Sequence, residues 1–211
     1  MSFWHHRWET QQIGWHREIY NDLLTKHWDS IGAPDGGKVL VPLCGKSLDM
    51  MWFASQGYSV IGSEMVNQAI QTFFAENGLS PQITKDGNHV QHTCEQFTIF
   101  EGNFFDIEED TIQADSWYDR AAMIAIPPER REDYVEQLRN LTKENAVGLL
   151  ITFAYPPEEM DGPPFALHDE DVHRLFSEGF EVQCLETMDL TDEKDRGLSQ
   201  VTSSVFSIKR V

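Results

Sequence analysis

Gly45 and Glu64 are the residues of this chain whose type and spacing best suit chemistry, because together they match a nucleotide site. Gly45 closes a turn that follows a short apolar run, and Glu64 ends a second apolar run 19 residues later. A glycine in such a turn lets the backbone approach a ligand, and an acidic side chain at the second strand tip accepts hydrogen bonds from ribose hydroxyls. The pattern predicts a βαβ unit that binds an adenosine-bearing cofactor.

The residues around Gly45 discriminate among four cofactors. A nucleoside triphosphate loop ending in Gly45-Lys-Ser would need glycine where Leu40 stands. NAD needs closely spaced glycines, but Pro42 and Cys44 occupy those places, and NADP needs a basic residue where Glu64 stands. S-adenosylmethionine carries no phosphate, so one glycine suffices, and its ribose diol suits Glu64. A βαβ unit without a ligand also fits the pattern.

The elements that must position these residues alternate between strand and helix. Residues 3–28 are predicted as an aromatic-rich helical extension. Strands are expected at 38–41, 58–63, 97–101, 116–119 (a brief strand edge), 146–154, 180–185 and 201–208, and helices at 47–56, 68–77, from Pro127-Pro128 onward, and at 169–178. Alternation implies a parallel sheet, and the last two strands imply an antiparallel hairpin. We expect one domain, 1–211: an α/β, mostly parallel seven-stranded sheet with helices on both faces.

Composition restricts the partners and the compartment. A net charge of −19 with scattered positive charges disfavours nucleic acid. The three cysteines form no CxxC pair, which predicts no disulfide framework or zinc site and fits a cytoplasmic protein. No apolar run is long enough to cross a membrane, and no signal peptide is evident.

Histidines and Cys44 invite other chemistry. His5, His6 and His16 suggest a metal site, but proximity in sequence is weak evidence of convergence, and we predict none. His89 and His92 are expected in a surface loop. Cys44 has no identifiable base, so it is predicted to be a small buried residue.

The run Val41-Pro-Leu-Cys-Gly-Lys-Ser47 resembles the core signature of the thiopurine S-methyltransferase family, in its bacterial branch. Further similar segments, in the same order, are Phe3-Trp-x-x-Arg-Trp8 with Trp15-His16, residues 57–64, Tyr118–Ala122 and Gly162-Pro-Pro-Phe165. The resemblance implies a Rossmann-like class I methyltransferase with S-adenosyl-L-methionine as cofactor and S-adenosyl-L-homocysteine as product. It also implies that residues 1–34 form a helical lid over the cofactor.

The resemblance assigns roles to individual residues. The cofactor-binding set is Trp8, Leu43, Gly45, Glu64, Asn103, Phe104 and Arg120; the acceptor-binding set is Trp4, Trp15, Phe165 and Arg196; and Arg120 is the catalytic residue. From the residues alone, the tryptophans could instead anchor a helix in the core, and Arg120 could pair with Asp119 or Asp115. The loop Asp192–Arg196 is more acidic than the family pattern, so either Arg196 supplies the substrate-facing arginine or the position is lost.

The resemblance implies methyl transfer to the sulfur of an aromatic or heterocyclic thiol such as 6-mercaptopurine, and extends to selenium and tellurium compounds, a detoxification activity. We expect a small-molecule thiol or chalcogen substrate and a monomer. A non-catalytic S-adenosylmethionine sensor and a methyltransferase with another small-molecule acceptor are the alternatives. Oxygen- or nitrogen-directed transfer is disfavoured because Ile126-Pro-Pro-Glu129 replaces the Asn/Asp-Pro-Pro-Tyr motif.

Overall fold

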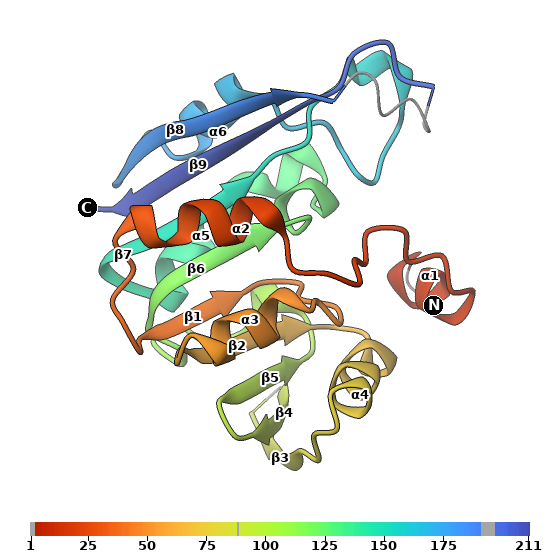
Figure 1. The fold of residues 1–211 in the computed structure, drawn as a ribbon, viewed down its shortest axis with the longest axis vertical. Helices are drawn as coiled ribbons and strands as arrows, with labels where there is room; N and C mark the ends of the chain where they lie inside the picture. Colours follow the sequence, from red (N-terminus) through yellow and green to blue (C-terminus); the bar gives the residue numbers. More distant parts are fainter. Residues whose placement is uncertain (1–2, 88, 191–196) are drawn as a thin grey trace.

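The computed structural model describes residues 3–87, 89–190 and 197–211, and a nine-stranded sheet forms the centre of this described part (Figure 1). In chain order the strands are β1 Lys38–Val41, β2 Ser59–Glu64, β3 Gln82–Asp86, β4 His89–Cys94, β5 Phe97–Glu101, β6 Ala114–Arg120, β7 Thr142–Ile151, β8 Phe180–Asp189 and β9 Thr202–Arg210. Their order across the sheet is β3-β4-β5-β2-β1-β6-β7-β9-β8. Strands β5, β2, β1, β6 and β7 pair in parallel, and β9 and β8 close one edge antiparallel. The α/β class and the C-terminal antiparallel hairpin are confirmed.

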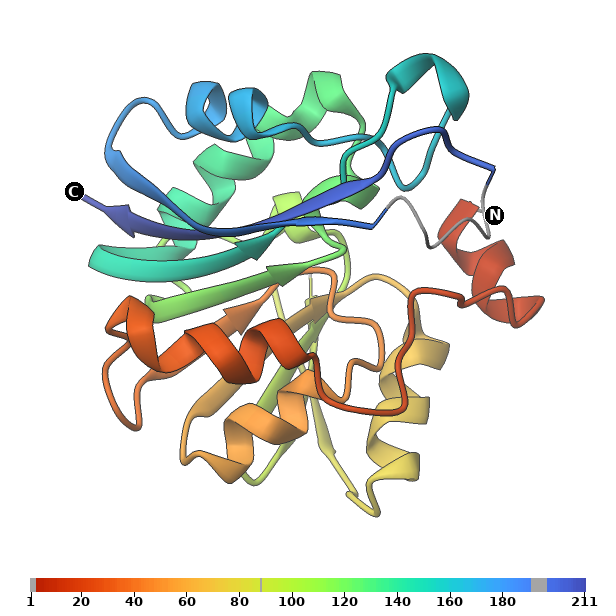
Figure 2. The same cartoon turned by 45° about the horizontal axis from the view of Figure 1, so that its top comes forward.

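Helices cover both faces of the sheet (Figures 1 and 2). The α-helices are α1 Phe3–Glu9, α2 Asp22–His27, α3 Asp49–Ser55, α4 Asn67–Glu76, α5 Arg131–Leu141 and α6 Asp169–Leu175; short 3-10 helices are η1 Trp28–Ile31, η2 Phe104–Asp106, η3 Met123–Ala125, η4 Pro128–Arg130 and η5 Pro157–Glu159. Two buried clusters result, one with α5 and α6 and the other with α2, α3 and α4. Strand β1 contributes side chains to both clusters, because successive strand residues point to opposite faces of the sheet. Leu40 belongs to the first cluster, and Val39 and Val41 belong to the second.

Two strand predictions were wrong. The sheet has nine strands rather than seven, because the antiparallel hairpin β3–β4 extends the edge next to β5. Its sequence is polar and lacks a clear apolar alternation, so it gave no strand signal. The segment 116–119 is not a strand edge either: β6 runs from Ala114 to Arg120 and lies between β1 and β7 in the middle of the sheet.

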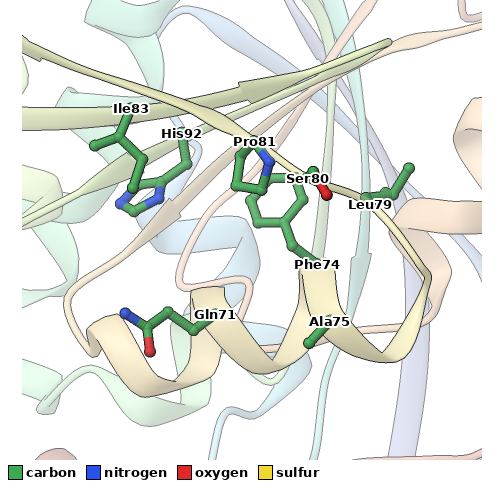
Figure 3. A pocket seen from close by; sticks show the side chains of 8 residues that line it. All are labelled: Gln71, Phe74, Ala75, Leu79, Ser80, Pro81, Ile83 and His92. Atoms are coloured by element: carbon green, nitrogen blue, oxygen red, sulfur yellow. The ribbon is translucent and has the colours of Figure 1, made fainter.

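The hairpin also corrects the placement of two histidines. His89 and His92 lie in β4, not in a surface loop, and are only 5% and 2% exposed. His92 Nε2 is 2.7 Å from Glu101 Oε2, and its ring stacks on Phe74. His92 also borders a hollow between the last turns of α4 and the hairpin, lined by Gln71, Phe74, Ala75, Leu79, Ser80, Pro81, Ile83 and His92 (Figure 3).

The N-terminal region is not one helix over residues 3–28, as the sequence suggested. Helix α1 ends at Glu9 and α2 begins at Asp22, with no helix between them. The Asn21 side chain accepts hydrogen bonds from the backbone N–H groups of Leu23 and Leu24, which caps α2, and the fully buried Leu24 anchors that helix to the sheet. Helix α1 is separated from α2 and lies at the carboxyl edge of the parallel strands (Figure 1).

Candidate functional site

The carboxyl ends of the parallel strands bring the predicted cofactor residues to one edge of the sheet. Leu43 and Gly45 follow β1, Glu64 ends β2, Asn103 follows β5 and Arg120 ends β6. Open α/β sheets bind their ligands outside this edge. Residues separated by up to 77 positions in the sequence are thus gathered by the parallel topology.

The turn after β1 holds two residues in the left-handed backbone region. Leu43 has φ +47° and Gly45 has φ +54°. Glycine adopts this region freely, whereas a leucine there costs about 1–2 kcal/mol, which the surrounding structure must offset. The turn is tied to β2 by the Cys44 N–H, which donates to the Ser63 carbonyl at 2.9 Å. Strained residues of this kind cluster at ligand sites.

Glu64 is a buried carboxylate aimed at the same turn. Its Oε2 accepts the Gly45 N–H at 2.9 Å, its Oε1 accepts the Val66 N–H at 2.8 Å, and the residue is 8% exposed. Burial raises the pKa of the Glu64 carboxyl, and the N–H groups of Val66 and Gly45 offset part of that rise. A carboxylate has about four acceptor positions, so each oxygen keeps capacity for a further donor, such as a ribose hydroxyl.

Three tryptophans from the N-terminal region cover this turn. Trp8 is 3% exposed and packs with Val66 and Ala69 at the start of α4, joined by Trp4 and Trp15. The Trp4 and Trp15 rings meet edge to face with centroids 5.5 Å apart, and those of Trp8 and Trp15 are 6.3 Å apart. The tryptophans therefore form a satellite cluster over the site, apart from the two main cores.

Trp8 and Trp15 lie close to the backbone of Gly45. A Cβ atom at Gly45 would lie 3.4 Å from Trp8 Cζ2 and 4.0 Å from both Trp15 Nε1 and Glu64 Oε2. Gly45, Glu64, Trp8 and Trp15 therefore meet at one place. An aromatic wall beside a carboxylate suits a ligand with an apolar body and a diol.

Arg120 pairs with neither Asp119 nor Asp115, so that alternative was wrong. Its Nε donates to Asp49 Oδ2 and its Nη1 to the Trp15 carbonyl, both at 3.1 Å. Asp119 instead accepts the Tyr134 hydroxyl at 2.6 Å. No hydrogen bond joins Arg120 Nη2 to any other residue of the described ranges, which leaves this donor for a ligand.

Asp49 and His89 are site residues that the sequence reasoning missed. The buried Asp49 carboxylate accepts three hydrogen bonds, one of them from Arg120. His89 Nε2 lies 3.1 Å from the Asn103 carbonyl and so supports the loop after β5. The only sequence signal for Asp49 was an acidic residue in the first turn of the helix after the glycine turn, and nothing in the sequence distinguished His89.

The loop after β5 supplies the side of the site opposite Arg120 in the sheet order. The Gly102 N–H donates to the Glu64 carbonyl at 3.0 Å, which links the tips of β5 and β2. Asn103 is exposed at this tip, but the Phe104 ring is only 3% exposed and packs against Tyr134 in the core. If Phe104 borders a ligand, its backbone rather than its ring faces it.

The predicted acceptor wall is held by hydrogen bonds to its backbone groups. The Phe165 N–H donates to the Ile124 carbonyl at 2.7 Å, just beyond Arg120 in the loop after β6. The Tyr155 hydroxyl donates to the Pro164 carbonyl at 2.6 Å, and the buried Arg131 donates its Nη2 to the Phe165 carbonyl at 3.3 Å. The segment 162–165 is thus fixed beside the β6 loop. Arg196 lies outside the described residues.

Cys44 has the surroundings of a packing residue. It is 6% exposed, and a Cβ on the neighbouring strand residue Gly62 would lie 2.8 Å from its Sγ. Burial raises the pKa of its thiol well above the usual value, with the Glu64 charge adding to the rise, so the thiolate needed for nucleophilic attack is disfavoured.

Within the described ranges, no three His, Cys, Asp or Glu side chains are grouped to hold a metal ion. None of the described helices is long and apolar enough to cross a bilayer.

Comparison with known proteins gives a consistent result. The family described as thiopurine S-methyltransferase matches residues 1–211. A thiopurine S-methyltransferase of Shewanella amazonensis is 46% identical over 196 residues, which cover 92% of this chain and 90% of the relative, and one of Shewanella loihica is 41% identical over 214 residues, covering 99% and 98%. Among solved structures, a Burkholderia thailandensis N-methyltransferase with bound S-adenosylhomocysteine aligns with a TM-score of 0.67 at 14% identity, covering 98% of this chain and 84% of that one.

Proposed function

The chain belongs to the thiopurine S-methyltransferase family, and we propose that it transfers the methyl group of S-adenosyl-L-methionine to the sulfur of an aromatic or heterocyclic thiol such as 6-mercaptopurine. The structural observation that best supports this function is the position of Trp15. Its ring borders Gly45, and its carbonyl accepts a hydrogen bond from Arg120. One residue thus joins the cofactor turn to the group that we assign to the acceptor.

The cofactor fits the residues of the site. Glu64 keeps acceptor capacity for both ribose hydroxyls, Gly45 allows close backbone approach, and Trp8 offers an apolar wall. We assign Leu43 to the same contact surface and Asn103, with the Phe104 backbone, to the adenine side. When bound, S-adenosyl-L-methionine supplies a methyl group already activated by its sulfonium.

The protein's task is then to align the acceptor sulfur and to favour its anionic form. Arg120 is the assigned catalytic residue: its free Nη2 can donate to a thiolate, and a nearby positive charge lowers the pKa of a thiol. An aromatic heterocyclic thiol is acidic enough that no strong base is needed. Trp4, Trp15 and Phe165 would stack on a planar acceptor, and Arg196 is the assigned substrate contact of the C-terminal loop.

The lid, the partners and the compartment complete the proposal. We assign the lid role to the part of residues 1–34 that precedes α2, since α2 packs into the core whereas Trp8 and Trp15 cover Gly45. The substrate is a small thiol, or a selenium or tellurium compound, and the protein acts as a monomer. Three free cysteines support a cytoplasmic location.

Transfer of labelled methyl groups tests this function directly. The purified protein is incubated with methyl-labelled S-adenosylmethionine and 6-mercaptopurine, and a parallel reaction with selenite or tellurite is scanned for volatile methylated products. We expect methylated mercaptopurine. Tight S-adenosylhomocysteine binding without transfer to any of these acceptors would refute it and favour a non-catalytic sensor or another acceptor.

A further inference from the structure

Asp49 is a buried carboxylate on which three separate parts of the chain converge. It is 2% exposed and opens α3, directly after the glycine turn. Its Oδ1 accepts the Asn21 N–H at 2.8 Å, and its Oδ2 accepts the Tyr118 hydroxyl at 3.0 Å and the Arg120 Nε at 3.1 Å. The carboxylate therefore joins the N-terminal region, the cofactor turn and the end of β6.

These bonds fix the direction in which Arg120 points. The Arg120 side chain is 16% exposed, and its guanidinium is held at Nε by Asp49 and at Nη1 by the Trp15 carbonyl. A guanidinium is a rigid plane, so two anchored nitrogens set the direction of Nη2. Without Asp49, only the Trp15 carbonyl would hold the group, and it could rotate about that contact.

The same carboxylate connects Arg120 to the N-terminal region. Asn21 donates its backbone N–H to Asp49 while its side chain caps α2, so the start of α2 is attached to the carboxylate that holds Arg120. Trp15, six residues earlier, contacts Arg120 from the other side. The described structure thus fixes the segment that carries the tryptophans at both Trp15 and Asn21.

We propose that Asp49 is a positioning residue for methyl transfer: it holds the Arg120 guanidinium so that Nη2 faces the acceptor, and through Asn21 it links that orientation to the docking of the N-terminal segment. The proposal rests on the function proposed above, in which Arg120 favours the acceptor anion. In this proposal Asp49 acts through Arg120 and makes no contact of its own with cofactor or acceptor. Its effect should therefore appear in turnover and vanish when Arg120 is absent.

Asp49→Asn is the informative change because it keeps the size of the side chain. An amide has one acceptor oxygen, whereas Asp49 uses both oxygens to accept from Asn21, Tyr118 and Arg120. Either the Arg120 bond is lost, or it becomes a weaker neutral bond while the Asn21 bond is lost. We expect kcat with 6-mercaptopurine to fall roughly 10- to 100-fold, the range typical of a misplaced catalytic group.

The KM for S-adenosylmethionine should change far less than kcat, because the contacts of Gly45 and Cys44 with β2 do not involve Asp49. Asp49→Glu restores the charge and should recover part of the turnover. Asp115→Asn is the matched control: it alters a carboxylate at the other end of β6 that accepts from Lys143 and from the Lys38 N–H. That control should keep wild-type turnover.

A double-mutant cycle with Arg120→Ala decides the question. If Asp49 acts through Arg120, the double variant should have the turnover of Arg120→Ala alone to within about twofold. Three results would overturn the inference while leaving the proposed function intact. The first is a loss of turnover in the double variant equal to the product of the two single losses. The others are an unchanged kcat in Asp49→Asn and equal losses in kcat and cofactor affinity. Normal turnover of Arg120→Ala would instead refute the assigned role of Arg120, and the inference with it. If Asp49→Asn does not fold, the same cycle is run with Asp49→Glu, for which a partial loss that disappears without Arg120 is expected.

Discussion

Replacing Glu64 by glutamine should weaken cofactor binding by an amount that the structure allows us to work out. Each Glu64 oxygen already accepts one backbone N–H, from Gly45 at 2.9 Å and from Val66 at 2.8 Å, and each has room for one ribose hydroxyl. Glutamine has one acceptor oxygen and an amide NH2, which cannot accept. The NH2 group can no longer accept the backbone N–H at its position, and toward the ribose it can only donate to a hydroxyl oxygen. Both charge-assisted bonds to the ribose are therefore replaced by neutral ones.

The expected loss follows from the strength of such bonds. A hydrogen bond to a charged group contributes about 1.5–3 kcal/mol and a neutral one about 1 kcal/mol. Replacing two bonds of the first kind by two of the second costs about 2 kcal/mol, which corresponds to a roughly 30-fold higher Kd. Isothermal titration calorimetry with S-adenosylhomocysteine measures this directly, with thermal unfolding as the check that Glu64→Gln is folded.

A matched variant separates this effect from a general loss of negative charge. Glu76 lies on α4 with its side chain 53% exposed and pairs with Lys46 of the glycine turn at 2.7 Å. Because exposed ion pairs contribute less than about 1 kcal/mol, Glu76→Gln should change the Kd by only a few-fold. An affinity change below about fivefold in Glu64→Gln would refute the ribose assignment. Equal losses in both variants would refute it as well, since the site would then respond to charge rather than to geometry.

Three further predictions concern stability and the N-terminal segment. Gly148→Ala should destabilise the protein by about 3 kcal/mol or more in urea unfolding, because a Cβ there would lie 1.9 Å from Trp117 Cε2 in the core; an unchanged midpoint would contradict the packing described. Burial raises the pKa of the Asp119 carboxyl, so its contribution to folding is present below the ordinary aspartate pKa and is lost as the pH rises through the higher folded pKa. The stability of the wild type relative to Asp119→Asn should therefore decline over that window, and a constant difference would argue against it. Trp8→Ala removes the buried anchor of the N-terminal segment, so trypsin should cleave after the exposed Arg17 faster than in the wild type, and equal rates would show that Trp8 does not hold the segment.

Several features could be predicted from sequence because they depend on neighbouring residues. Short segments of the sequence are enough to predict the βαβ unit from β1 to β2, the C-terminal hairpin and the family signature. The spacing of Gly45 and Glu64 predicted two residues at adjacent strand tips, and the structure joins them by a hydrogen bond. Because β1 and β2 pair in parallel, the turn after β1 and the last residue of β2 lie side by side at the same edge of the sheet.

Other features were decided by tertiary structure. The polar hairpin β3–β4 joins the sheet through the pairing of β4 with β5, which places the buried His92 opposite Ile99. The alternative pairing of Arg120 with Asp119 or Asp115 considered only charges close in sequence, whereas its partner Asp49 lies 71 residues away. Local periodicity and turn chemistry thus predicted the βαβ unit and an adenosine-bearing cofactor, and the family resemblance specified S-adenosyl-L-methionine. Which side chain holds Arg120, and what covers Gly45, depend on contacts between distant segments, and only the packing of the whole chain brings these together.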